Sequence, residues 1–503
     1  MMRHATPPVL IALIGLACAV LLAAPGRTIT SAFMNDVLIF LDGAHRIHWG
    51  QVPNRDFHTA LGPLVYLIPA AGYWITGNLG GALPVGMALL ILIFTPIAIH
   101  VLESRLRPVL AVPFGAFLIL LLAVPMNLGD RIGALSFAMF YNRIGWAGLG
   151  LLVVMYLPPL AARPWQEGRD VLCASALTLI QLYTKLTYGA VALAFLVFLL
   201  IVPGQRRRAA LSLVLVIATA AVVEVFWRGT ASHLADLMET ARISGGRGLA
   251  ALIGPVFRNF ADLTVLALIA GIALWQRGSA WDAVFYVASA ATGLLIVSQN
   301  AHNWGIATIY AGSVVAAQRI MAADGSMARA VPLALLAFML PPTLYHASAL
   351  VLHSGLAMAN AGTPLGLPAF QGVRYTRLWS AGDRGFSRRY VDSFQGGGAA
   401  LAGLGQGIGP VATLDFANPF SAGLGLRPPK GDNAWLHWNR NVSRDHHLPP
   451  EQFYRDVKII MEPKIGINSV QLHSIYGPFI DRHFTPVRET DEWTIHIRRE
   501  AGE

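Results

Sequence analysis

The chain has 503 residues, of which 55% are hydrophobic and only 13% are charged, and its mean hydropathy is +0.54. An ordinary soluble domain carries about 25% charged residues, so this composition excludes a water-soluble globular protein. The formal net charge of +10 is spread over short loops between apolar runs, which is typical of membrane topology signals and disfavours a nucleic-acid partner.

Apolar runs long enough to cross a bilayer recur from residue 9 to residue 350. We predict about eleven transmembrane helices, near residues 9–26, 82–102, 108–126, 144–161, 171–185, 188–203, 209–227, 261–275, 281–298, 304–318 and 329–350. The first run resembles a signal peptide, but many further spans follow it, so we expect an uncleaved first span. The predicted fold class is an α-helical polytopic membrane protein.

Short basic loops alternate with longer loops of different composition. The basic loops are 103–107, 161–170, 204–210, 275–282 and 317–330. The positive-inside rule places them in the cytoplasm, which predicts a cytoplasmic N-terminus and an extracytoplasmic C-terminal part. The first outer loop then covers residues 27–81. Its segment 62–77 is apolar but short and bounded by proline, so we expect a helix lying at the membrane interface.

The character of the sequence changes near residue 351. The chain becomes rich in Pro, Asn and charged residues, and short β-like pieces occur at 411–416, 457–462 and 492–499. We therefore predict two domains, a transmembrane domain over residues 1–350 and a small mixed α/β extracytoplasmic domain over residues 351–503.

Ionisable residues crowd the first outer loop. Asp36 and Asp42 follow the first span, and Arg46 comes four residues after Asp42, so these two can pair on one helix face. Carboxylates at a membrane boundary are costly unless they are solvated or paired, which makes them functional candidates. A solvated loop with ordinary surface charges is the alternative interpretation.

The order of motifs in this loop is similar to that of a known enzyme class. An acidic residue is followed by a helix that carries "AHR" and ends in glycine, and then by "PNRDF" and "GPLVY". This order resembles the first outer loop of GT-C class membrane glycosyltransferases, in the branch of protein mannosyltransferases and lipid A aminoarabinose transferases. The order of elements agrees over residues 9–350, and the residue-level match covers residues 33–66.

The resemblance implies transfer of a sugar from a polyprenyl-phosphate donor to an acceptor outside the cytoplasm, with a first-loop Asp as general base. By position, the acidic pair of the family falls on Asn35 and Asp36, and Asn35 departs from the pattern. Asp36 is therefore the first candidate for the base and Asp42 the second. Asp56 matches the second acidic position of the loop.

The leaving phosphate of such a reaction needs cations or N–H donors. The candidates for binding the donor phosphate are Lys185, Arg46, Arg55 and Arg143. Lys185 interrupts a long apolar stretch, although a lysine reaching for the interface explains it equally well. The candidates for binding substrate are His58, Gln299, Asn300 and His302. A tight interhelical turn also explains the polar segment 298–304.

The sequence implies no firm cofactor, and no metal site is assigned, although a divalent metal stays open. The expected partners are a polyprenyl-phosphate sugar donor, membrane lipids, and a glycan, lipid or protein acceptor. Two alternatives remain. One is a transporter or flippase of lipid-linked sugar, which would place ionisable groups near mid-span. The other is a non-catalytic component of cell-envelope assembly, which the departure at Asn35 keeps open.

Overall fold

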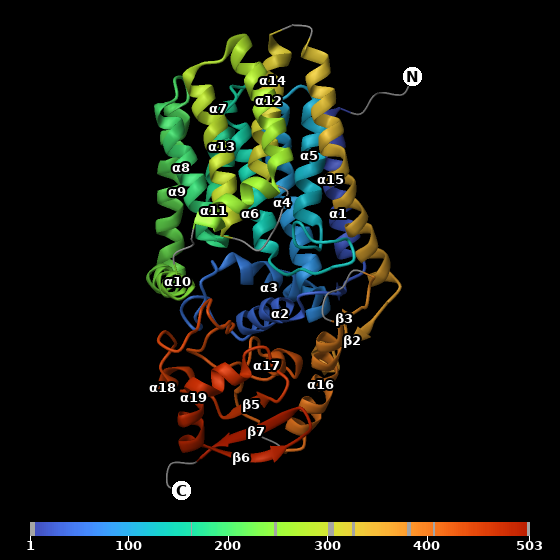
Figure 1. Cartoon of the computed structure of the whole chain (residues 1–503), viewed down its shortest axis with the longest axis vertical. Helices are drawn as coiled ribbons and strands as arrows, with labels where there is room; N and C mark the ends of the chain where they lie inside the picture. Colours follow the sequence, from blue (N-terminus) through green and yellow to red (C-terminus); the bar gives the residue numbers. More distant parts are fainter. Residues whose placement is uncertain are drawn as a thin grey trace.

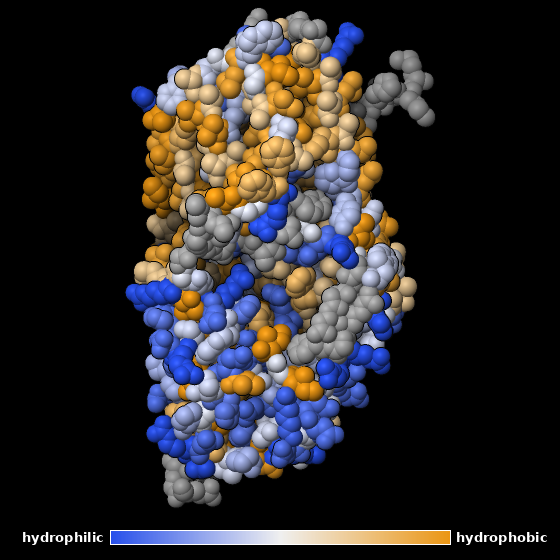
Figure 2. Space-filling view, in the orientation of Figure 1, coloured by the Kyte–Doolittle hydropathy of each residue, from blue (hydrophilic) through white to orange (hydrophobic). Residues whose placement is uncertain are grey.

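The computed structural model describes residues 6–161, 163–245, 249–299, 306–323, 327–379, 384–405 and 408–499. Long helices run side by side in a bundle, and the chain after residue 358 forms a smaller body at one end of it (Figure 1). Figure 2 shows apolar side chains over the bundle and hydrophilic ones over the smaller body. An apolar helical bundle suits a bilayer, because each helix satisfies its own backbone hydrogen bonds.

Each of the eleven predicted spans overlaps one helix of the bundle within the described residues. These helices are α1 (Pro7–Ala23), α4 (Leu79–Arg105), α5 (Pro108–Ala123), α6 (Phe140–Val154), α7 (Gln166–Thr184), α8 (Leu186–Ile201), α9 (Arg206–Trp227), α12 (Phe260–Arg277), α13 (Ala280–Ser298), α14 (Ala307–Ala322) and α15 (Met327–Met358). Within the described ranges, α4, α9, α13 and α15 are long and apolar enough to cross a membrane. The predicted class of helical membrane protein is confirmed, and the number of spans stays a prediction.

Further helices lie at the end of the bundle that faces the smaller body (Figure 1). They are α2 (Met34–His48), α3 (Leu64–Thr76) and α10 (Thr230–Ser244), and α11 (Leu249–Arg258) leads into α12. The expected interfacial segment forms α3, which packs on α2 and α4. It ends at Gly77, whose φ of 66° is the left-handed cap conformation that glycine adopts at low cost. Its position at a membrane interface stays a prediction.

The basic loops meet at the opposite end of the bundle. Asp170, at the start of α7, forms ion pairs with Arg105 from the end of α4 (2.7 Å) and with Arg208 from the start of α9 (3.0 Å). Asp282, in the first turn of α13, pairs with Arg319 of α14 at 2.7 Å. The loops that the charge pattern assigns to one side therefore lie together, and their arginines also connect the helix ends.

Two small sheets organise the chain after residue 358. In the first, β3 (Val373–Tyr375) pairs in parallel with β1 (Thr28–Thr30) and antiparallel with β2 (Thr363–Pro364). Because β1 belongs to the first outer loop, this sheet joins that loop to the C-terminal part. Parallel pairing of strands so distant in sequence leaves no local signal, and the sequence did not predict it.

The second sheet has the strand order β4-β5-β7-β6. Its strands are β4 (Val411–Thr413), β5 (Ile459–Pro463), β6 (Phe484–Glu489) and β7 (Trp493–Arg498), and the surrounding helices are η1 (Pro368–Phe370), α16 (Arg384–Ala402), α17 (Pro419–Gly423), α18 (Pro450–Phe453) and α19 (Ser469–His483). The expected strands at 411–416, 457–462 and 492–499 correspond to β4, β5 and β7. The expected small mixed sheet is confirmed. The mostly exposed edge strand β6 was missed, because it lacks the alternation of a half-buried strand.

Candidate functional site

A cavity of about 650 Å³ opens where the bundle meets the C-terminal body. Its bundle side comes from α2, the junction between α7 and α8, and the end of α13, and its other side comes from α10 and the C-terminal loops at residues 416 and 435–440. Apolar and polar groups both line it. Such a cavity suits a substrate with a lipid part and a polar part.

Asp36 lines this cavity from the first turn of α2. Phe33, the residue before the first residue of α2, has a left-handed backbone conformation with φ 53°. The helix therefore begins abruptly, and Phe33 also lines the cavity. Burial raises the pKa of the Asp36 carboxyl to about 6, while the charge of Arg440 opposes that rise. A carboxyl with a pKa near neutrality is well matched to accepting a proton at physiological pH.

Lys185 reaches the same cavity from a break between two helices. Its extended backbone (φ −156°, ψ 121°) ends α7 and begins α8. Its Nζ donates a hydrogen bond to Asn142 Oδ1 at 3.3 Å and lies 5.2 Å from the centre of the Tyr141 ring. An ammonium group held by an amide and an aromatic face is positioned for an anionic ligand group.

The first outer loop is fixed to this break by Gly62. Its backbone N–H donates to the carbonyl of Thr184 at 3.0 Å. A Cβ at Gly62 would lie 2.1 Å from the carbonyl oxygen of Tyr183, so only glycine fits without a shift of the backbone. The loop that carries Asp36 and the break that carries Lys185 therefore hold one another in place.

The C-terminal wall of the cavity contains Phe416, Trp435, His437 and Arg440. The sequence analysis did not assign these residues to the site. The local signal for three of them is the aromatic and basic stretch "WLHWNR" at 435–440. Such a stretch does not by itself indicate a position beside a membrane cavity. Tertiary contact alone connects it with Asp36.

Of the residues predicted for the site, Asp36, Lys185 and Gln299 line the cavity. Gln299 caps the end of α13, and its Oε1 accepts a hydrogen bond from Thr187 Oγ1 at 3.3 Å. Asn300 and His302 lie outside the residues that the structure describes. The remaining predicted residues are absent from the described lining of this cavity and have other neighbours.

Asp42 and Arg46 form a buried ionic cluster with Asp432. Arg46 Nε donates to Asp42 Oδ2 at 2.6 Å, and its Nη1 and Nη2 donate to the two carboxylate oxygens of Asp432 at 2.7 Å each. The side chain of Arg46 is 1% exposed. Burial disfavours the charged guanidinium, but Asp42 and Asp432 outweigh that effect and raise the pKa of Arg46. We call these three residues the clasp.

Asp56 and Arg55 lie beside the clasp. Asp56 Oδ2 accepts from the backbone N–H of Val52 at 2.8 Å, and its other oxygen lies 3.6 Å from Lys430 Nζ. Arg55 pairs with Asp56 at 3.4 Å, and its side chain is 43% exposed. The contact between Asp56 and Lys430 connects the first loop with the C-terminal body, as the clasp does.

Arg143 and His58 occupy two further environments. Arg143 is buried in the bundle, where its Nη1 donates to the carbonyl of Met126 at 2.8 Å. His58 lies beside the cavity, with Nδ1 2.9 Å from Asp236 of α10. The hydrogen bond with Asp236 raises the pKa of His58, although burial opposes it. His58 thereby fixes α10 against the first loop.

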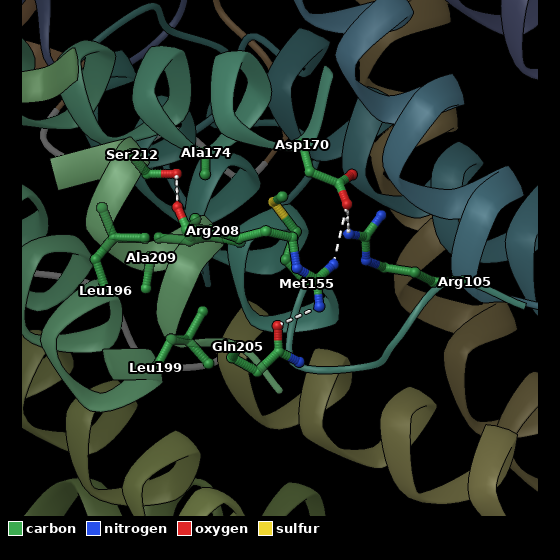
Figure 3. A pocket seen from close by; sticks show the side chains of 11 residues that line it. Arg105, Met155, Asp170, Ala174, Leu196, Leu199, Gln205, Arg208, Ala209 and Ser212 are labelled. Atoms are coloured by element: carbon green, nitrogen blue, oxygen red, sulfur yellow. Dashed lines mark hydrogen bonds and ion pairs between the residues drawn. The ribbon is translucent and has the colours of Figure 1, made fainter. Parts of the chain in front are cut away.

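A second polar cluster lies at the other end of the bundle, around Asp170. Figure 3 shows Arg105 and Arg208 pointing toward the Asp170 carboxylate, with Gln205 beside Arg208. These side chains satisfy one another in a space of about 20 Å³, which has little room for a ligand. Among the described residues, no group of three or more His, Cys, Asp or Glu side chains is arranged to hold a metal ion.

Comparison with known proteins finds similarity in structure and none in sequence families. No family model matches the chain, and no curated protein matches it. ArnT from Cupriavidus metallidurans in the apo state has a TM-score of 0.49 and 13% sequence identity, covering 97% of each chain. ArnT from the same organism bound to undecaprenyl phosphate has a TM-score of 0.47, with the same identity and coverage. At this level of similarity the function has to be inferred from the residues of the cavity.

The clasp is expected to hold the C-terminal body against α2. Replacing Arg46 by methionine (Arg46→Met) leaves two buried carboxylates without a cation, which costs about 3–5 kcal/mol of folding free energy. We expect a clear fall in the midpoint of heat unfolding and faster proteolysis after residue 358. The exposed pair of Arg55 and Asp56 provides the control, because Arg55→Met should change stability by less than about 1 kcal/mol. Equal unfolding midpoints for the two variants would contradict the clasp.

Proposed function

We propose that the protein is an integral-membrane glycosyltransferase of the GT-C class, which transfers a sugar from a polyprenyl-phosphate donor to an acceptor outside the cytoplasm. The observation that carries the proposal is the cavity that holds both Asp36 and Lys185 at the boundary between the apolar bundle and the polar body. A lipid-linked donor needs this boundary, because its chain stays in the bilayer while its sugar enters water. The motif order of the first outer loop supports the same class.

In the proposed reaction Asp36 is the general base. Its carboxylate takes the proton of the acceptor hydroxyl as the acceptor oxygen bonds to the anomeric carbon of the donor sugar. The bond between that carbon and the phosphate oxygen breaks, and the polyprenyl phosphate leaves with the electron pair. Lys185 stabilises the negative charge that develops on the leaving phosphate, and Asn142 and Tyr141 hold its ammonium group in position.

The position of Asp42 favours Asp36 over it as the base. Asp42 is engaged by Arg46, and its side chain is 2% exposed. A carboxylate that is this deeply buried and bonded to a guanidinium leaves no approach for an acceptor hydroxyl. In the proposal Asp42 keeps its place in the clasp, and Arg46 and Asp56 hold the C-terminal body.

The proposed orientation follows from the charge of the loops. The basic loops lie together at the end of the bundle where Asp170 and Asp282 bind their arginines. We infer that this end faces the cytoplasm, as the positive-inside rule asks. The cavity and the C-terminal body then face the extracytoplasmic side, where the acceptor is met.

Asp36→Asn should abolish most of the transfer activity. Because a positioned base contributes about 10²–10⁴ in rate, we expect kcat to fall at least about 100-fold while donor binding persists. The measurement is the release of polyprenyl phosphate from a panel of radiolabelled polyprenyl-phosphate monosaccharides, with membranes as the source of acceptor.

Two further acid variants complete that experiment. Asp392→Asn, at an exposed pair in α16, should leave kcat unchanged. Asp42→Asn should reduce the amount of folded protein more than the rate per folded molecule. Full activity of Asp36→Asn would exclude Asp36 as the base.

Lys185→Met should weaken transition-state stabilisation and donor binding together. Loss of one charge-stabilising donor costs about 10²–10³ in rate, and Lys185→Arg should restore part of it by retaining the positive charge. Lys464→Met removes a lysine paired with Glu489 in the C-terminal body and serves as the control. Wild-type kcat and donor KM in Lys185→Met would contradict the phosphate role.

The activity should depend on pH through Asp36. Because its pKa is raised to about 6, the carboxylate form grows as the pH rises through this value, and kcat/KM should rise with it and then level off. Arg440 lowers this pKa by its charge, so Arg440→Gln should move the rise to higher pH. The exposed Arg444→Gln should not move it. A profile that is flat between about pH 5 and 8 would contradict an Asp36 base with this pKa.

A further inference from the structure

The C-terminal wall of the cavity is an aromatic surface next to one cation. The ring centres of Phe416 and Trp435 are 5.9 Å apart, and those of Phe416 and His437 are 5.2 Å apart. The guanidinium carbon of Arg440 lies 6.0 Å from the centre of the Trp435 ring. These four side chains lie opposite α2 and the α7–α8 junction across the cavity.

Two asparagine side chains hold the backbone of this wall in place. The side chain of Asn441 donates to the carbonyl of Trp435 at 2.8 Å and accepts from the backbone N–H of His437 at 2.7 Å. Asn468 donates to the carbonyl of Leu436 at 2.9 Å. Side-chain bonds that clamp both ends of a short loop fix the orientation of its aromatic rings before any ligand arrives, which lowers the entropy cost of binding.

Trp435 has an unused hydrogen-bond donor. Its Nε1 is buried, and it has no hydrogen-bond partner among the described residues. An indole N–H can only donate, and buried donors in folded proteins are normally satisfied. This atom has almost no accessible surface, so Trp435 offers the cavity its ring rather than its N–H. The negative faces of the aromatic rings attract the C–H groups of a pyranose in the same way that they attract the edge of another ring.

The charges of the cavity decide what kind of sugar fits. The acidic and basic side chains among its described lining residues are Asp36, Lys185, Arg440 and His437, and burial, with the neighbouring Arg440, lowers the pKa of His437. The charge of Arg440 acts on Asp36, and Lys185 has the donor phosphate in the function proposed above. The two cations then match two negative charges, those of Asp36 and of the donor phosphate, so an uncharged acceptor leaves the charges of the described lining balanced.

We propose that the wall formed by Phe416, Trp435, His437 and Arg440 is the acceptor subsite, and that it takes an uncharged saccharide. The saccharide stacks on the ring of Trp435, and the hydroxyl that receives the sugar faces Asp36. The role of this site in binding the acceptor rests on the proposed function, whereas the binding of a saccharide to it does not.

The test measures saccharide binding without any transfer reaction. The full chain in lipid nanodiscs is titrated with methyl glycosides of glucose, galactose and mannose, with their uronic acids, and with their 6-phosphates. Saturation-transfer NMR reports which ring C–H groups contact the protein. We expect at least one neutral glycoside to bind about tenfold more tightly than its two charged analogues.

Variants of Trp435 locate that binding. Trp435→Ala should weaken it about tenfold or more, and Trp435→Phe should keep most of it, because the stacking face remains. Trp165→Ala removes an 83% exposed tryptophan remote from the cavity and is the control. Binding of polyprenyl phosphate is measured in both Trp435 variants, and retained binding shows that a variant is folded.

Three results would overturn the proposal. They are the absence of binding by every neutral glycoside, equal or tighter binding of the charged analogues, and unchanged binding in a folded Trp435→Ala variant. Failure of the proposed function would give a different result, namely full transfer activity in Asp36→Asn, and it would leave the saccharide-binding results unaffected.

Discussion

The bidentate pairing of Arg46 with Asp432 determines how the two halves of this protein face one another. Arg46 lies on α2, in the first outer loop, and Asp432 lies 386 residues later in the C-terminal body. A buried guanidinium between two carboxylates is stable only with near-ideal geometry, because desolvation of the three charges otherwise outweighs their attraction. Together with the pairing of β1 and β3, this ion pair holds the C-terminal body against the first outer loop, and in this arrangement Trp435 and Arg440 line the cavity.

Helix α2 performs two tasks with two of its faces. Asp42 and Arg46 are four residues apart and lie on one face, which holds the C-terminal body. Asp36 precedes Asp42 by six residues, so it points about 120° away around the helix and faces the cavity instead. One short helix thus carries both the residue proposed for catalysis and the residues that position the wall opposite it. A shift of α2 would disturb both together.

The cavity combines elements that the chain supplies far apart from one another. Lys185 reaches it only because α7 and α8 are separated by one extended residue, and Gly62 lets the first loop approach the backbone of that break closely. In the proposed function, the polar head and the apolar lipid chain of the donor contact different walls of this cavity. The opposite end of the bundle has a different character, since its buried Asp170 is paired with Arg105 and Arg208.

The sequence by itself determined the class of fold and the positions of the apolar helices. The reason is that the hydropathy of about 20 consecutive residues decides whether a helix is stable in a bilayer, and this is a local property. It also identified Asp36 and Lys185 as candidates, since a charge beside or within an apolar run stands out. It did not separate Asp36 from Asp42, nor Lys185 from the arginines of the first loop, because both sets have the same residue types and similar surroundings in sequence. Tertiary structure distinguishes their surroundings, because Asp36 and Lys185 line the cavity whereas Asp42 and Arg46 are buried in the clasp with Asp432. It also brought Trp435, His437 and Arg440 to the cavity, since the contact of a C-terminal loop with the first outer loop leaves no periodic pattern in either segment.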